Sequence, residues 1–228
     1  MIRGLVFDID DTLYDEREYV RSGFFAVAQV AGHSDGEATA LADWLGTAFE
    51  AGIRGDTFDR LRASFPEVGG RVSTAALVDA YRAHLPDIAL STGVPEMLDR
   101  LEALGLRLGV LSDGHAASQM AKVAALGLER WFDPILLTGS REPRFAKPGT
   151  AGFEAIAQGW RLAASELVYV ADNPEKDFAG PRRLGWMTVR LAHPRQLRHR
   201  LEPADEDHQP DVVIGAPADL LRLLSLGE

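Results

Sequence analysis

The segment IRGLVFDIDDTLY, residues 2–14, joins a short apolar run to a group of acidic residues. The run Ile2–Asp8 predicts a buried strand that ends at its first carboxylate. Side chains two apart along a strand share a face, so Asp8 and Asp10 are expected side by side. Ionised carboxylates so placed repel each other unless a cation compensates them. The segment therefore indicates a divalent metal and a phosphorylated substrate, and a solvated acidic turn is the alternative.

Composition restricts the class of protein. The 228 residues suffice for one or two domains with a substantial core, and the net charge of −10 argues against a nucleic-acid-binding surface. The chain has no cysteine, which excludes disulfides, thiolate catalysis and cysteine-ligated metals. The acidic residues near the start do not fit a signal peptide, and no apolar run approaches the roughly 20 residues of a membrane span. We therefore expect a soluble cytoplasmic protein with no nucleic-acid or membrane partner.

Lysine is rare among the basic residues. Of the 24 basic residues, only Lys122, Lys147 and Lys176 are lysines. In an arginine-rich chain a lysine is a candidate for a position that needs a compact ammonium group. For Lys122 we expect chance rather than a function.

Apolar runs and helical patterns alternate along most of the chain. This alternation predicts an α/β fold with a doubly wound parallel sheet. Strands are expected at Ile2–Asp8, Leu106–Ser112, Ile135–Thr138, Leu167–Asp172, Trp186–Arg190 and Asp211–Ile214. Helices are expected at 94–104, 115–126 with Gly127 as C-cap, 149–160, 217–226 and after Asp172, where Pro174 suits a first helical residue.

No strand pattern occurs between about residues 15 and 90. Helical periodicity is found there instead, at 16–31, 37–51, 56–64 and 73–85. We therefore predict a catalytic core of residues 1–14 and 91–228, with a small helical cap of residues 15–90 inserted after the first strand. The cap is expected to choose the substrate. The polar segment 192–210 is expected to be a surface connection.

Polar residues occur at or just beyond the ends of several predicted strands. Ligands of parallel α/β sheets bind beyond the carboxyl ends of the strands. The residues expected to converge there are Asp8, Asp10, Ser112, Asp113, Lys147, Asp172 and Asp177. Asp177 is placed in the first turns of the helix that follows Asp172.

The order of these residues resembles the four motifs of the haloacid dehalogenase superfamily, in its phosphatase branch. The motifs are Asp-x-Asp-x-Thr, a Ser or Thr that ends a strand, a Lys often followed by Pro, and Gly-Asp with a second Asp five residues later. The matching residues are, in that order, Asp8, Asp10 and Thr12; Ser112; Lys147; and Asp172 with Asp177. Ala171 stands where the family usually has Gly, which removes no side-chain chemistry.

The resemblance implies hydrolysis of a small phosphorylated metabolite through an aspartyl-phosphate. Asp8 would attack phosphorus, and Asp10 would protonate the leaving oxygen and then deprotonate the hydrolytic water. Ser112 and Lys147 would bind the phosphoryl oxygens.

The resemblance also implies Mg²⁺ at this site. Its expected ligands are Asp8, the backbone carbonyl of Asp10, and Asp172, because Mg²⁺ prefers hard oxygen ligands. The other members of the set are expected in supporting roles: Thr12 in its loop, Asp113 in the turn after its strand, and Asp177 beside Lys147 or a metal-bound water.

Asp10 separates the activities known in the family. The family's dehalogenases lack this second acid, so phosphoryl transfer is favoured over dehalogenation. A sugar-phosphate mutase would keep Asp10, but such enzymes typically have Gly where this chain has Asp11. The sequence Ser112-Asp113-Gly114 resembles a Thr-Asp-Gly subset from sugar and cell-surface polysaccharide pathways, which favours a sugar or polyol phosphate. A mutase and a non-catalytic binding protein on this fold stay open as alternatives.

Overall fold

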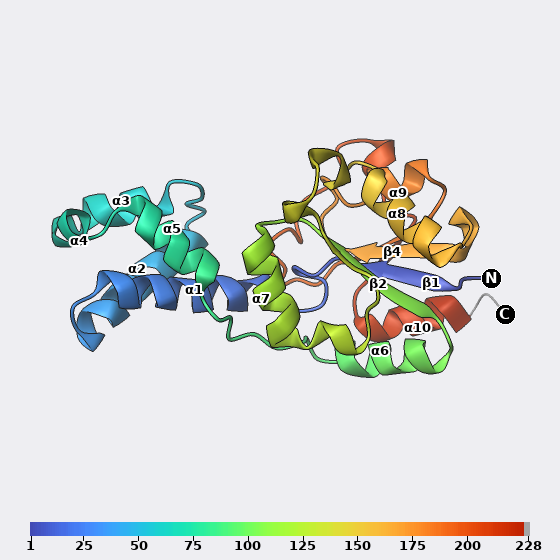
Figure 1. Cartoon of the computed structure of the whole chain (residues 1–228), viewed down its shortest axis with the longest axis horizontal. Coiled ribbons are helices and arrows are strands. Elements are labelled where there is room, and N and C mark those ends of the chain that lie inside the picture. The colour runs from blue at the N-terminus through green and yellow to red at the C-terminus, as the bar shows by residue number, and fades with distance from the viewer. Residues whose placement is uncertain (226–228) are drawn as a thin grey trace. The chain divides into compact units, whose positions relative to one another are not determined.

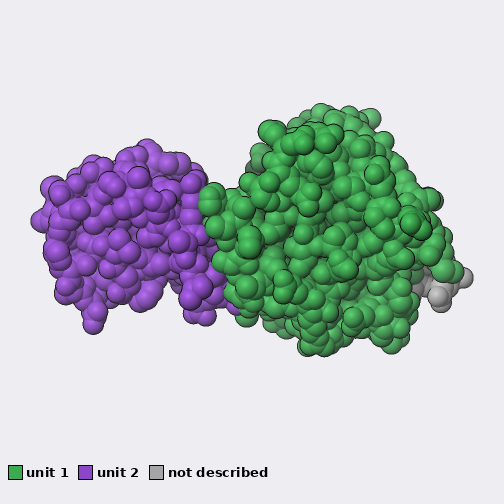
Figure 2. Space-filling model, in the orientation of Figure 1, with its two compact units in different colours: residues 1–16, 89–228 green, residues 17–88 purple. Residues whose placement is uncertain are grey.

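The computed structural model describes residues 1–225 and divides into two compact units (Figures 1 and 2). The α/β unit consists of Met1–Glu16 together with Ala89–Glu228, and the helical unit consists of Arg17–Ile88. The helical unit is thus an insertion into the α/β unit, directly after the segment that follows the first strand. Among the described residues, no helix combines the length and the apolar character needed to cross a membrane.

The α/β unit is built on a six-stranded parallel sheet of order β3-β2-β1-β4-β5-β6. Its strands are β1 (Gly4–Phe7), β2 (Arg107–Ser112), β3 (Ile135–Leu137), β4 (Leu167–Ala171), β5 (Met187–Leu191) and β6 (Val212–Ile214). The central strands β1 and β4 are buried at every position, as expected for strands covered on both faces. The predicted fold class is therefore confirmed.

Helices cover both faces of this sheet. They are α6 (Val94–Ala103), α7 (Ala116–Leu126), α8 (Ala151–Trp160), α9 (Ala179–Arg183) and α10 (Pro217–Ser225). Figure 1 shows α6 and α10 together on one side of the sheet, with α8 and α9 on the other. Under α8, Phe153 meets Tyr169 and Trp186 edge to face, with ring centroids 4.8 Å and 5.5 Å apart. This packing holds the ring of Tyr169 in place beneath the sheet edge that carries the candidate site.

The predicted helix at Pro174 is wrong, because side chains hold the backbone there in a turn. Asn173 Oδ1 accepts the N–H of Glu175 at 3.0 Å, and Asp177 Oδ2 accepts the N–H of Asn173 at 2.9 Å. Asn and Asp side chains commonly compete with helix formation in this way. The helix begins only at Ala179, so Asp177 lies in the turn before it. The predicted C-cap of α7 is confirmed, since Gly127 has a left-handed φ of 62°.

The helical unit contains five short helices. They are α1 (Glu16–Ala31), whose first residue belongs to the α/β unit, α2 (Asp35–Glu50), α3 (Thr57–Ser64), α4 (Pro66–Arg71) and α5 (Thr74–Ala83). The ring of Phe24 packs against Phe49, Phe58 and Tyr81, with centroids 5.8 to 6.4 Å apart. The sequence did not predict α4, because six residues that include two glycines give no measurable helical period.

Candidate active site

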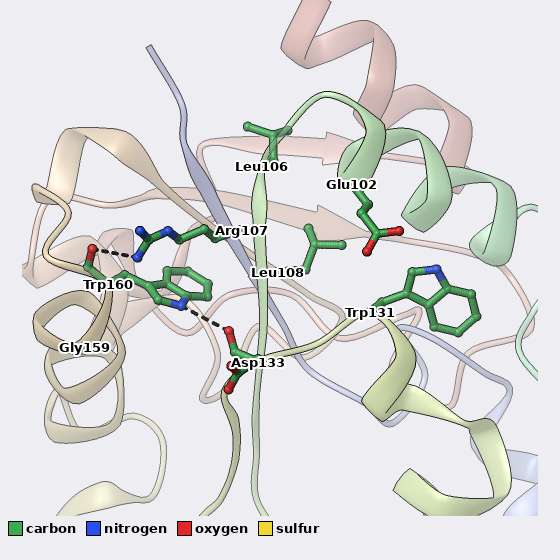
Figure 3. Close-up of a pocket in the computed structure, with 8 residues that line it drawn as sticks. All are labelled: Glu102, Leu106, Arg107, Leu108, Trp131, Asp133, Gly159 and Trp160. Atoms are coloured by element: carbon green, nitrogen blue, oxygen red, sulfur yellow. Dashed lines mark hydrogen bonds between the residues drawn. The ribbon is translucent and has the colours of Figure 1, made fainter.

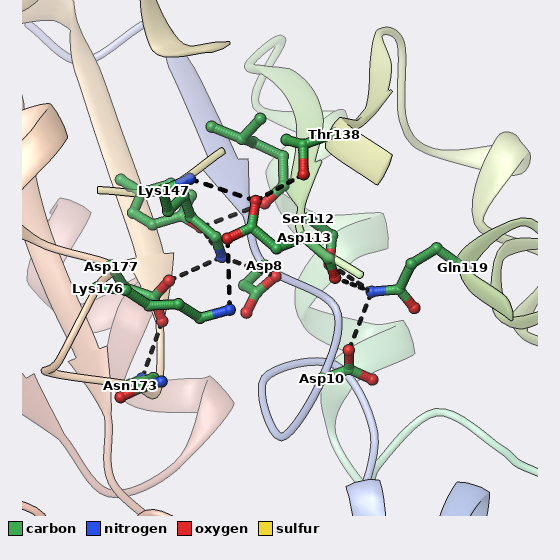
Figure 4. Close-up of polar contacts among 12 residues, drawn as sticks. Asp8, Asp10, Ser112, Asp113, Gln119, Thr138, Lys147, Asn173, Lys176 and Asp177 are labelled. Atoms are coloured by element: carbon green, nitrogen blue, oxygen red, sulfur yellow. Dashed lines mark hydrogen bonds and ion pairs between the residues drawn. The ribbon is translucent and has the colours of Figure 1, made fainter. Parts of the chain in front are cut away.

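The carboxyl ends of three neighbouring strands bring the predicted residues together (Figure 4). Asp8 directly follows β1, Ser112 is the last residue of β2, and Asp172 directly follows β4. Since β1 pairs with both β2 and β4, these strand ends are adjacent. All three side chains are buried.

Three carboxylates form a buried cluster at this edge. Asp8, Asp172 and Asp177 each place an oxygen within 4.8 Å of the other two. Asp172 Oδ2 has no hydrogen-bond partner, and burial together with the charges of Asp177 and Asp8 raises the pKa of Asp172 well above its usual range. A buried anionic cluster with an unpaired oxygen is unfavourable without a cation. This all-oxygen donor set therefore fits a hard divalent ion such as Mg²⁺.

Lys147 is the buried counter-charge of the cluster. Its Nζ lies 2.7 Å from Asp177 Oδ1, 3.1 Å from Asp8 Oδ1 and 3.0 Å from the hydroxyl of Tyr169. Burial lowers the pKa of Lys147, but the charges of Asp177 and Asp8 outweigh burial and raise it well above its usual range. The lysine is therefore charged at neutral pH, and its contact with Asp177 fits the orienting role expected for that aspartate.

The surroundings of Asp8 favour its ionised form. Burial raises the pKa of Asp8, but the ammonium groups of Lys147 and Lys176 and a hydrogen bond from Ser112 outweigh this effect and hold the pKa below its usual range. The ionised carboxylate is the nucleophilic form. The site can therefore present a buried, reactive carboxylate at neutral pH.

Asp10 faces helix α7 and has its own counter-charge. Lys122 Nζ lies 2.6 Å from Asp10 Oδ1, and the hydroxyl of Tyr14 donates to the same oxygen. The side chain of Lys122 is only 7% exposed. The expectation that Lys122 is present by chance is therefore wrong. The expectation that Asp8 and Asp10 share a strand face is wrong as well, because β1 ends at Phe7 and Asp10 lies beyond it, where its carboxylate pairs with Lys122.

Gln119 joins Asp10 to the end of β2. Its Nε2 donates to Asp10 Oδ2 at 3.0 Å, to Ser112 Oγ at 2.9 Å and to the carbonyl of Asp113 at 2.6 Å. Gln119 and Lys122 are three residues apart, so they share one face of α7. Two long polar side chains on the buried face of a helix were the sequence signal that could have revealed this role.

Asp113 was expected only to support the turn after its strand, but it connects several loops of the site. Its Oδ1 accepts a hydrogen bond from Thr138 Oγ1 at 2.7 Å and one from the backbone N–H of Lys147 at 3.3 Å. Its Oδ2 lies 3.5 Å from Lys176 Nζ. The single carboxylate thus ties together the loops that follow β2, β3 and β4.

Comparison with known proteins adds to this geometry. Residues 2–185 match the family of haloacid dehalogenase-like hydrolases. The chain belongs to this family. The predicted resemblance is thereby confirmed.

Several relatives and solved structures resemble the hydrolase over nearly its whole length. The glyceraldehyde 3-phosphate phosphatase of Methanocaldococcus jannaschii is 26% identical over 238 residues, which cover 98% of this chain and 97% of the relative. The ribulose-1,5-bisphosphate 5-phosphatase of Halopiger xanaduensis is 29% identical, with coverages of 99% and 100%. The crystal structure of a predicted phosphoglycolate phosphatase from Haemophilus somnus superposes with a TM-score of 0.62, 20% identity and 98% coverage of both chains. This structure supports the fold assignment alone.

The loop after β1 of the hydrolase is held by Asp11 rather than by the hydroxyl of Thr12. Thr12 Oγ1 is buried without a hydrogen-bond partner. Asp11 Oδ1 accepts the N–H of Glu16 at 2.9 Å, and Oδ2 accepts the N–H of Leu197 at 2.7 Å. Burial, opposed by these two hydrogen bonds, raises the pKa of Asp11 to about 6. The segment 192–210, expected to be a mere surface connection, therefore braces the loop that carries Asp10.

A separate cavity of the hydrolase opens at the amino-terminal edge of the sheet (Figure 3). It has a volume of about 460 Å³ and lies beside Arg107, the first residue of β2. Arg107 donates to the carbonyl of Trp160 at 2.8 Å, and the indole N–H of Trp160 donates to the carbonyl of Asp133 at 3.1 Å. Because it lies at the opposite end of β2 from Ser112, this cavity has no part in the candidate active site.

Proposed function

We propose that this hydrolase is a Mg²⁺-dependent phosphatase that cleaves a small phosphorylated metabolite through an aspartyl-phosphate on Asp8. The observation that carries the proposal is the buried carboxylate of Asp8, which belongs to the acidic cluster with Asp172 and Asp177 and lies 3.1 Å from Lys147 Nζ. Relatives named as phosphatases, similar over nearly the full chain, support the same reaction class.

The reaction needs a nucleophile and a proton carrier. In the first step, Asp8 forms a bond to phosphorus while the bond to the leaving oxygen breaks, and Asp10 gives its proton to that oxygen. In the second step, water attacks phosphorus, Asp10 takes back a proton, and the bond between Asp8 and phosphorus breaks. Asp8 and Asp10 lie two residues apart but have separate lysine partners, which fits two separate tasks.

The remaining residues stabilise charge on the phosphoryl group. Ser112 at the end of β2 and the charged Lys147 are proposed to act on the phosphoryl oxygens. Asp8 and Asp172 would hold Mg²⁺, with the backbone carbonyl of Asp10. Bound there, the ion would neutralise negative charge on the phosphate group.

A sugar or polyol phosphate is the proposed substrate class. The names of two relatives, glyceraldehyde 3-phosphate phosphatase and ribulose-1,5-bisphosphate 5-phosphatase, support small sugar phosphates. A mutase is less well supported, because the carboxylate of Asp11 fixes the loop through Glu16 and Leu197, which the Gly typical of mutases could not do.

Phosphate release by the purified protein tests the proposal. The assay compares sugar, polyol, nucleoside and amino-acid phosphates with p-nitrophenyl phosphate, with and without Mg²⁺. We expect turnover that requires Mg²⁺ and disappears in Asp8→Asn, with an unchanged circular dichroism spectrum. Turnover that persists in Asp8→Asn contradicts the proposal, and activity that needs a sugar bisphosphate and retains phosphate on the product indicates a mutase.

A further inference from the structure

Lys176 is the most exposed of the three lysines at the site. Its side chain is 33% exposed, compared with 7% for Lys122 and 0% for Lys147. Within the described part of the chain, the one side-chain acceptor near its Nζ is Asp113 Oδ2, at the long distance of 3.5 Å. An ammonium group has three N–H donors, so Lys176 retains donors for a ligand.

Lys147 is far more enclosed than Lys176. Its Nζ donates to the hydroxyl of Tyr169 and forms ion pairs with Asp177 and Asp8, all within 3.1 Å, and its side chain is fully buried. A substrate that approached this ammonium group would compete with two buried carboxylates for it. Lys147 therefore acts on a phosphoryl group chiefly as a fixed nearby charge.

Lys176 lies close to the nucleophile. Its charge acts on both Asp8 and Asp177. In Figure 4 its ammonium group is joined to Asp113 by a dashed line, and its side chain extends toward the carboxylate of Asp8. The turn that carries Lys176 is fixed from both sides, since Asp177 Oδ2 accepts the N–H of Asn173 and Asn173 accepts the N–H of Lys176 at 3.4 Å. The ammonium group is thus held beside the cluster while its side chain stays partly exposed.

We infer that Lys176 contacts the substrate directly, by donating from its ammonium group to an oxygen of the phosphate that binds at Asp8. Asp113 holds the side chain in this position. The ligand class is a phosphate monoester dianion, or orthophosphate as the product. The cluster contributes three carboxylates against one enclosed lysine, so an arriving dianion needs further positive charge, and Lys176 supplies part of it. This inference rests on the proposed phosphatase function.

Binding of orthophosphate tests the inference without requiring turnover. The dissociation constant is measured by isothermal titration calorimetry in Mg²⁺ buffer for wild type, Lys176→Met and Lys176→Arg. A charge-assisted hydrogen bond at a partly exposed site predicts a dissociation constant about 10-fold higher in Lys176→Met, with most of the affinity kept in Lys176→Arg. The matched control is Arg3→Met, which removes a charge just before the amino end of β1. The side chain of Arg3 pairs with Glu166 and is 57% exposed. This variant should bind phosphate within about twofold of wild type.

Kinetics with p-nitrophenyl phosphate supply a second readout. We expect Lys176→Met to raise KM more than it lowers kcat, because the lost contact is already made in the bound substrate. Lys176→Gln replaces the Met variant if the latter does not fold. Wild-type phosphate affinity in a folded Lys176→Met or Lys176→Gln overturns the inference and leaves the phosphatase proposal standing. A wild-type protein that neither binds phosphate nor releases it from any ester overturns both.

Discussion

Replacing Lys122 with methionine tests whether Asp10 works as a proton donor in the orientation that the structure gives it. Methionine keeps most of the side-chain volume but removes the ammonium group 2.6 Å from Asp10 Oδ1. Breaking a fully buried ion pair costs about 3–5 kcal/mol. Asp10 is 19% exposed and retains Gln119 and Tyr14, so we expect a loss of about 1–3 kcal/mol in the free energy of unfolding.

The same substitution should affect catalysis selectively. A general acid contributes about 100-fold to 10,000-fold to rate, and Asp10 without Lys122 is less well oriented for that task. We expect kcat for an alkyl phosphate to fall about 10-fold, as partial loss of that contribution. Turnover of p-nitrophenyl phosphate should change much less, because its leaving group departs without a proton.

Urea unfolding and phosphate release from both esters measure the two effects. The matched control is Arg130→Met, which removes an ion pair with Asp99; the side chain of Arg130 is 64% exposed. This variant should lose less than about 1 kcal/mol in the free energy of unfolding. Equal losses of kcat for the two esters would refute the acid role of Asp10. Unchanged stability in Lys122→Met would refute the claim that the ion pair is buried and structural.

Three further changes have definite expected outcomes. Tyr169→Phe removes the hydroxyl that accepts a hydrogen bond from Lys147 and donates one to the carbonyl of Leu111 at 3.2 Å. Urea unfolding should show a loss of about 1–3 kcal/mol in the free energy of unfolding. The phosphatase assay should show a lower kcat with KM nearly unchanged. Mg²⁺ should raise the melting temperature of the wild-type protein. Without Mg²⁺, Asp172→Asn should melt at a higher temperature than the wild type, because asparagine removes a buried charge, and added Mg²⁺ should stabilise this variant little. A rise in melting temperature with Mg²⁺ as large as in the wild type would contradict the assignment of Asp172 as a metal ligand. Gly127→Ala places a side chain on a left-handed residue and should cost about 1 kcal/mol in urea unfolding, and a neutral result would contradict the C-cap assignment.

The sheet could be predicted from the sequence because its signals are local. Each apolar run that predicts a strand lies within a few residues of an observed strand, and the polar residues at the ends of β1, β2 and β4 needed only chain order to be placed at one edge. The turn before α9 was missed because Pro174 is a favourable first helical residue on its own. What overrides it is a pair of hydrogen bonds made by the side chains of Asn173 and Asp177.

The partners of the site residues could not be predicted, because they depend on contacts between distant segments. Lys122 is 112 residues from Asp10 in sequence, and Gln119 is 109 residues from it. Tyr169 has the pattern of an ordinary core residue of β4, and only its hydroxyl beside Lys147 gives it a further role. The scarcity of lysine was a second sequence signal that pointed to these contacts, and for Lys122 it was interpreted as chance.

The three lysines explain how one small site accommodates so many acidic groups. Lys147 pairs with Asp8 and Asp177, Lys122 with Asp10, and Lys176 with Asp113. The side chains of the two aspartates of the first motif therefore have different lysine partners. Asp8 belongs to the cluster with Asp172 and Asp177, where a divalent ion fits, whereas Asp10 has its own ammonium partner on α7. In the proposed mechanism, separate compensation would let Asp8 be ionised as the nucleophile while Asp10 exchanges a proton, which two carboxylates in direct contact could not do independently.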